Sequence, residues 1–180
     1  EVLLNHSVQG ITYENDGWEL DTTKGVFTAP KLLIATGSNP KIWKLLESLG
    51  HQVTPPVPSL FTFNIKDARL KTIPGVVALN VHVSVVDSNL ESEGPLLVTH
   101  AGLSAPSILK LSAYGALELA EKKYKFEIKV NFIKQEFSEC VERLLEIKIA
   151  YPKKTVLKST QFDLPKRLWE QLVIASNLAS

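Results

Sequence analysis

Three prolines within four positions place the strongest constraint on how this chain can fold. They lie in the segment Val53–Pro58, which reads Val-Thr-Pro-Pro-Val-Pro. Proline has no backbone N–H and holds φ at about −65°, so this cluster cannot form a helix interior or a central strand. We therefore expect residues 53–58 to be a stiff connector between two domains. A chain of 180 residues is long enough to form two small ones.

The residues before the connector have the pattern of short strands followed by a buried strand and a helix. Val2–Thr28 alternates and carries a hairpin turn signal at Asp16-Gly17, which predicts an antiparallel meander. Lys31–Gly37 is apolar without alternation, as is typical of a strand buried on both faces of a parallel sheet. Apolar residues at helical spacing then predict a helix over 42–49, ended by Gly50.

After the connector the pattern is first β and then helical. The clean alternation of Gly75–Val86 predicts a strand with one buried face. That face would hold Val77, Leu79, Val81, Val83 and Val85. Helical spacing predicts helices over 105–120 and 137–148, and a third that begins at Asp163-Leu164-Pro165. The sequence therefore predicts an α+β fold.

The charge balance gives no sign of a polyanionic partner. The chain has 20 Lys and Arg against 19 Asp and Glu, for a net charge of +1. We therefore expect no nucleic acid and no anionic membrane as partner. Two local lysine clusters, Lys122-Lys123-Lys125 and Lys153-Lys154, are the exceptions, and a solvated surface is the favoured interpretation of both.

Two features of composition concern the origin of the chain. It contains no methionine and begins at Glu1, already inside an apolar run, which favours a piece cut from a longer protein. The single cysteine, Cys140, excludes an internal disulfide framework and is typical of a reducing compartment. We therefore expect a cytoplasmic protein.

The usual constellations for catalysis and metal binding are absent from the sequence. The four histidines have no metal-ligand spacing, so no metal site is expected. Gly102-Leu103-Ser104-Ala105-Pro106 resembles a nucleophile elbow, but Pro106 stands where that motif needs glycine and His100 precedes Ser104. A helix N-terminal role for Ser104 is therefore favoured over a nucleophile. No glycine-rich phosphate loop is present. The helix start after Thr99 could hold an anion, although a tight turn is favoured.

Several segments together resemble one known family. Leu32–Gly37 resembles the Ala-Thr-Gly strand end of flavoproteins with a two-dinucleotide-binding fold. Gly50-His51 and Pro55–Leu60 follow it. Pro95–Leu109 then contains Thr-His-Ala-Gly-Leu-Ser-Ala-Pro. This order is similar to the HI0933-like family, also called BaiN-like or YhiN-like flavoproteins, and the last segment is its most specific part.

The resemblance implies a domain organisation and a cofactor. Residues 1–52 would be part of the FAD-binding domain, with a flavin-domain β-meander and a buried strand. Residues 59–133 would be a small β-barrel insert domain, and residues 134–180 a helical subdomain. Ala35, Thr36 and Gly37 would border FAD in the full-length protein. This sequence departs from the family pattern at Ser38-Asn39-Pro40 and at Ala105, where the family often has glycine.

The leading functional prediction is a fragment of an FAD-dependent, NAD(P)-linked oxidoreductase-like flavoprotein that is not competent alone. Its partners would be the rest of the flavoprotein chain and a small-molecule substrate. The fragment would bind no FAD, because the pyrophosphate loop is absent. No catalytic residue is assigned; His100, Gly102 and Ser104 would form a functional or structural corner, with structure favoured. The alternatives are a barrel and helical binding module that docks a substrate or partner, and a hydrolase acting through Ser104.

Overall fold

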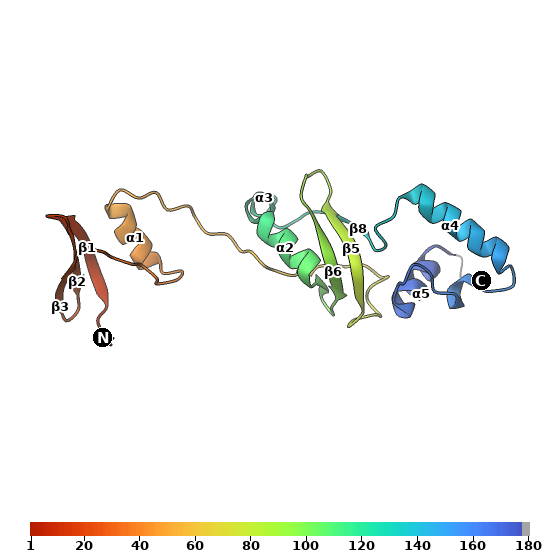
Figure 1. Cartoon of the computed structure of the whole chain (residues 1–180), viewed down its shortest axis with the longest axis horizontal. Helices are drawn as coiled ribbons and strands as arrows, with labels where there is room; N and C mark the ends of the chain where they lie inside the picture. Colours follow the sequence, from red (N-terminus) through yellow and green to blue (C-terminus); the bar gives the residue numbers. More distant parts are fainter. Residues whose placement is uncertain (178–180) are drawn as a thin grey trace. The chain divides into compact units, whose positions relative to one another are not determined.

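The chain divides into two compact units after Pro56, inside the proline-rich segment. The computed structural model describes residues 1–177 and contains both helices and strands, which confirms the α+β prediction (Figure 1). One unit is Glu1–Pro56 and the other begins at Val57. Residues 53–58 form neither helix nor strand. In the described part of the chain, each helix is too short or too polar to cross a lipid bilayer.

The first unit contains the predicted antiparallel meander. Its strands are β1 (Val8–Glu14), β2 (Gly17–Thr22) and β3 (Gly25–Ala29), in that order in the sheet. The first hairpin turns at Asn15 and Asp16, whose φ angles are 50° and 59°. Positive φ at both central residues matches the twist of the flanking strands, as in a type I′ turn. The turn therefore lies within the predicted segment 14–17, whereas the first strand begins at Val8 instead of Val2.

Helix α1 (Pro40–Ser48) forms where helical spacing predicted it. The side chain of Asn39 caps its first turn by accepting a hydrogen bond from the Lys41 N–H at 3.1 Å. Gly50 has φ 89°, and its N–H donates to the Glu47 carbonyl at 3.0 Å. A positive φ just after a helix is easiest for glycine, so Gly50 ends α1 as expected.

The predicted buried strand at Lys31–Gly37 does not form within the described residues. The segment is extended, but within residues 1–177 no strand pairs with it. Leu33 is 89% exposed. A strand needs a neighbour for its N–H and C=O groups, and burial on both faces needs a layer on each side. The described residues of the first unit supply neither.

The second unit is built on a curled, barrel-like antiparallel sheet. Its strands are β4 (Phe63–Asn64), β5 (Val77–Val85), β6 (Glu91–Val98), β7 (Gly102–Ser104) and β8 (Ile128–Asn131). The order in the sheet is β4-β7-β6-β5-β8. Helices α2 (Pro106–Tyr114) and α3 (Ala116–Glu121) follow β7, with a break at Gly115 where the sequence predicted one continuous helix. Leu96, Leu103, Ile108 and Leu111 are among the fully buried residues, so α2 and the sheet share one core.

A β-bulge in β5 changes which residues face the core. Val81, Val83 and Val85 are buried as predicted, but Val77 is 41% and Leu79 69% exposed. The register with β6 shifts between Ala78 and Val81, so that β5 has one residue more than its partner there. An extra residue reverses the two faces of a strand. Ala78 is therefore buried instead of its neighbours.

The chain ends in α4 (Phe137–Ala150), a short 3₁₀ turn η1 (Val156–Lys158) and α5 (Lys166–Ala175). The sequence predicts one apolar stripe on this last helix, made of Leu164, Leu168, Trp169, Leu172 and Val173. That stripe is confirmed, since Leu168, Trp169 and Val173 join the core of the barrel-like unit. Asp163 does not cap α5, because Pro165 occupies the capping position. Helix α4 has no buried residue, and Phe137 is 84% exposed. The helix predicted over 137–148 is therefore confirmed, and its apolar face is largely exposed.

Candidate functional site

The segment Thr99–Pro106 forms a tight corner that leads from β6 through β7 into α2. Gly102 lies at its centre with φ 153°. A Cβ atom at Gly102 would lie 2.1 Å from the Phe63 carbonyl oxygen and 2.5 Å from the Ile65 nitrogen. Nearby, the Ile65 N–H donates to the Ala101 carbonyl at 3.0 Å. Glycine is therefore required so that β4 can pair at this corner.

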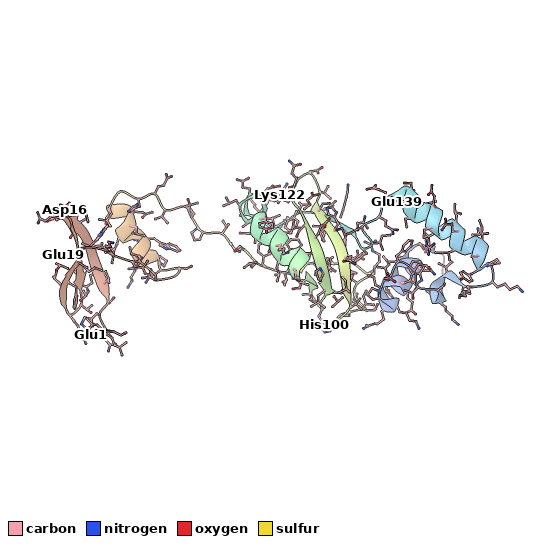
Figure 2. All side chains as sticks on the ribbon, in the orientation of Figure 1. Glu1, Asp16, Glu19, His100, Lys122 and Glu139 are labelled. Carbon is pink, nitrogen blue, oxygen red and sulfur yellow. The ribbon has the colours of Figure 1, made fainter. Side chains whose placement is uncertain are left out.

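The other two corner residues do not assemble a catalytic group. His100 is exposed at the edge of the unit (Figure 2). Ser104 is partly buried at the end of β7, and Ala105, with φ 81°, is the residue that precedes α2. Among the contacts of residues 1–177, no hydrogen bond joins the Ser104 hydroxyl to a histidine. The geometry therefore gives Ser104 no partner that could activate it as a nucleophile.

A shallow cavity of about 390 Å³ lies beside the corner, between Thr99–His100 and the loop 65–71. Lys66 and Lys71 line it together with Asp67. Arg69 Nε donates to Asp67 Oδ1 at 3.0 Å, and this hydrogen bond lowers the pKa of the Asp67 carboxyl. Asp67 therefore stays ionised and neutralises Arg69, which leaves the two lysines as the cations of the cavity.

The predicted cofactor residues Ala35, Thr36 and Gly37 are all exposed and lie in the unpaired segment after β3. The neighbouring start of α1 is already capped by Asn39. Binding a dinucleotide needs backbone N–H groups converging on its pyrophosphate. Three exposed positions of an unpaired segment do not provide that arrangement by themselves.

A more enclosed feature lies at the end of the chain, between α4 and the η1–α5 segment. We call it the α4–α5 groove; its volume is about 470 Å³. Its apolar walls come from Val141, Leu144, Leu145, Tyr151, Val156 and Trp169. The Trp169 indole N–H donates to the Val156 carbonyl at 2.8 Å, which ties α5 to η1. The groove is therefore apolar inside, and this hydrogen bond holds η1 and α5 together as one of its walls.

The rim of the α4–α5 groove is cationic. The stretch Ile147–Phe162 contains four lysines and no acidic residue. These are Lys148, Lys153, Lys154 and Lys158, all exposed. Lys148 and Lys154 line the groove, and the Lys154 ammonium lies 4.1 Å from the centre of the Tyr151 ring. Among the described residues, none of the four forms a salt bridge. The arrangement therefore places Lys148 and Lys154 at the apolar, aromatic groove, with Lys153 and Lys158 close by in the sequence.

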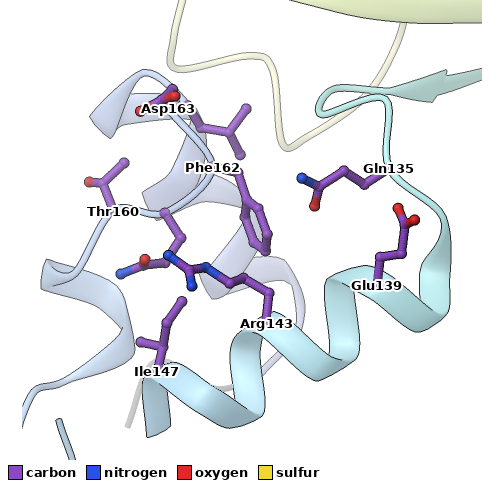
Figure 3. A pocket seen from close by; sticks show the side chains of 9 residues that line it. Gln135, Glu139, Arg143, Ile147, Thr160, Phe162 and Asp163 are labelled. Atoms are coloured by element: carbon purple, nitrogen blue, oxygen red, sulfur yellow. The ribbon is translucent and has the colours of Figure 1, made fainter. Parts of the chain in front are cut away.

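A second cleft of about 890 Å³ lies against α4 and is polar. Figure 3 shows Arg143 extending from α4 towards the segment that carries Thr160 and Phe162, with Glu139 nearby on the same helix. Arg143 also pairs with Glu146 at 3.2 Å. Because both signs of charge line this cleft, it does not select for an ion of either sign. Within residues 1–177 no group of three His, Cys, Asp or Glu side chains could hold a metal ion.

The comparison with known families decides the class. Residues 57–180 match the family described as the HI0933-like protein barrel and H2TH domain. The chain belongs to the HI0933-like family. The match confirms the resemblance seen in the sequence. The HI0933-like family is a flavoprotein family, and the barrel named in its description corresponds to the curled sheet of the second unit.

A characterised relative extends the comparison across the first unit. The chain is 26% identical over 178 residues to the ribosomal RNA dihydrouridine synthase of Escherichia coli strain K12. The alignment covers 94% of this chain and 42% of that protein. The HI0933-like chain described here therefore spans less than half the length of this relative.

Sequence reasoning did not identify the α4–α5 groove. Helical spacing predicts only that α4 has one apolar face, and the favoured interpretation of Lys153-Lys154 is a solvated surface. The available signal was the combination of an acid-free stretch with four lysines and Tyr151 at its centre. The net charge of the whole chain does not reveal that stretch, because acidic residues in other segments cancel its positive charge.

Proposed function

We propose that this chain is the substrate-binding part, with an adjoining stretch of the nucleotide domain, of an FAD-dependent enzyme that reduces uridines in ribosomal RNA. The observation that carries the proposal is the alignment with the Escherichia coli ribosomal RNA dihydrouridine synthase, which runs through both units. The family match over residues 57–180 supports the flavoprotein class.

The distribution of charge supports an RNA substrate over the small molecule expected from the sequence. The small molecule is what the resemblance to a flavoprotein family implies, whereas the expectation of no nucleic-acid partner rests on a net charge of +1 for the whole chain. Binding of a nucleic acid depends on local cations that reach phosphates. The four lysines of Ile147–Phe162, with no acidic residue among them, provide such a local surface.

In this proposal FAD carries out the reduction, and the residues of this chain bind the RNA. In the full-length protein a nicotinamide would reduce the FAD, and the reduced flavin would supply the hydride that, together with a proton, saturates the uracil C5–C6 double bond. Ala35, Thr36 and Gly37 would border it, but they do not form a site alone. The role of this chain would be to bind and orient the RNA, and the enzyme would act in the cytoplasm.

A chimaera tests the proposal. The 42% of the Escherichia coli protein that aligns with this chain would be replaced by residues 1–180, in a strain that lacks the native gene. Dihydrouridine in purified ribosomal RNA would be measured by mass spectrometry. The strain with the native gene restored and the strain with an empty vector are the controls.

We expect the chimaera to restore dihydrouridine above the empty-vector level. Ribosomal RNA without dihydrouridine, from cells in which the chimaera is folded and carries flavin, would overturn the proposal. In that case a binding module or a reductase of small molecules becomes the better interpretation.

A further inference from the structure

We infer that the α4–α5 groove binds an unpaired segment of RNA, with a base against Tyr151 and phosphates at the surrounding lysines. The choice of RNA as the polyanion rests on the proposed function. The groove itself, its charge and its aromatic residue are properties of this structure.

The exposed apolar walls indicate that a ligand occupies the groove when the protein functions. Leu144, Leu145 and Val156 line it and are all exposed. Together with Val141 they form a continuous apolar surface around one hollow, and surfaces of this kind usually mark binding sites. A nucleobase has two apolar faces and polar edges, so it can fill an apolar slot while its sugar and phosphate stay at the rim.

Tyr151 provides the stacking surface. It is 53% exposed, lies at the C-terminal end of α4 and lines the groove. The Lys154 ammonium, 4.1 Å from its ring centre, interacts with the ring through a cation–π contact. An exposed aromatic ring beside a flexible cation is the combination with which proteins hold a base and its phosphate.

The lysines determine the class of partner. Some lysines of the second unit pair with acidic neighbours, as Lys122 does with Glu118 at 3.7 Å and Lys166 with Glu170 at 3.9 Å. The four lysines of Ile147–Phe162 have none within that stretch. A partner rich in negative charge would complement this rim, whereas a second apolar protein surface would leave the lysines unmatched. The bases of unpaired RNA are also free to stack, which those of a duplex are not.

Fluorescence anisotropy of the chain with a labelled, uridine-rich RNA of about 12 nucleotides tests the inference, since single-strand sites have about this size. If four lysines each meet a phosphate, affinity should fall about 50-fold between 50 mM and 200 mM salt. A duplex of the same sequence should bind more weakly. Equal binding of duplex and single strand would overturn the assignment to unpaired RNA.

Two charge-reversal variants locate the site. Lys153→Glu with Lys154→Glu should weaken binding about tenfold or more, because two phosphate contacts become repulsive. Lys123→Glu with Lys125→Glu makes the same change in net charge at the other lysine cluster and should alter the affinity less than about threefold. An equal loss of affinity in both variants would show that RNA is attracted by net charge alone and not by a specific site. That result would overturn the inference.

Tyr151 variants separate stacking from charge. Tyr151→Ala should weaken binding roughly 5- to 150-fold, the range measured for loss of one base–aromatic contact. Tyr151→Phe keeps the ring and should bind as the unmodified chain does. Circular dichroism of each variant checks that the helices are intact. Full affinity in a folded Tyr151→Ala variant would overturn the role of the groove.

The outcomes distinguish this inference from the proposed function. If the chimaera makes no dihydrouridine but the groove variants lose RNA binding, the proposed function fails and the groove remains an RNA site. If the chimaera is active and the variants bind RNA normally, the groove assignment fails alone. If the chain binds no RNA and Leu145→Asp changes its sedimentation, the groove is a protein interface and the inference is overturned.

Discussion

Replacing Gly102 with alanine is the sharpest test of how the barrel-like unit is held together. The added Cβ would lie 2.1 Å from the Phe63 carbonyl oxygen, so β4 would have to move by more than an ångström. That movement would break the hydrogen bond from the Ile65 N–H to the Ala101 carbonyl, and with it the short β4–β7 pairing. Two hydrogen bonds at about 1 kcal/mol each, plus about 1–3 kcal/mol of backbone strain, give an expected loss of about 3–5 kcal/mol.

The loss would be measured by urea unfolding of the 180-residue chain, followed by circular dichroism and by amide exchange at Ile65. With a urea slope of about 2 kcal/mol per molar, the midpoint of the second unit should fall by about 2 M. Gly75→Ala is the matched control, since Gly75 also has a positive φ, 86°, but a Cβ there would meet nothing within 4 Å. If Gly102→Ala and Gly75→Ala shift the midpoint equally, the close approach of β4 is not what requires glycine.

Three further predictions concern the ion pairs, the core and the cofactor. The hydrogen bond from the Lys134 ammonium lowers the pKa of the Glu93 carboxyl, so this pair stabilises the fold above the ordinary glutamate pKa and loses its effect as pH falls through the lowered value. Lys134→Ala should therefore raise the Glu93 pKa in an NMR titration and flatten the acid dependence of stability; an unchanged pKa would refute the contact. Ser107→Ala removes the donor to the Pro95 carbonyl at 2.8 Å and should cost about 1–3 kcal/mol by thermal unfolding, with no loss refuting the role of that bond. The purified chain should show no stoichiometric flavin absorbance, because residues 35–37 form no site alone; a full flavin band would refute that conclusion.

Local rules predict the elements whose stabilising contacts are close in sequence. Helix α1 has its cap at Asn39 and its stop at Gly50 within the same twelve residues, so the sequence is sufficient to place it. The β1–β2 hairpin depends in the same way on Asn15 and Asp16. The stripe of α5 is correct because the helix is short and its apolar face meets the core directly.

Predictions fail where the deciding partner is distant or outside the described residues. The apolar run at Lys31–Gly37 implies neighbours on both sides, which residues 1–177 do not contain. The face of β5 depends on its register with β6, and alternation alone does not reveal a bulge. The groove beside α4 was missed for the same reason: an apolar helix face has the same pattern whether a core or a ligand covers it.

The bulge between Ala78 and Val81 also has a consequence for how this part of the protein can vary in length. Deleting one of the two residues there would restore regular pairing with β6 and keep Ala78 and the buried valines on the same face. The same deletion between Val81 and Val85 would turn half of those side chains out of the core. Insertions and deletions among natural variants of β5 are therefore expected between Ala78 and Val81, while the rest of the strand keeps a constant length.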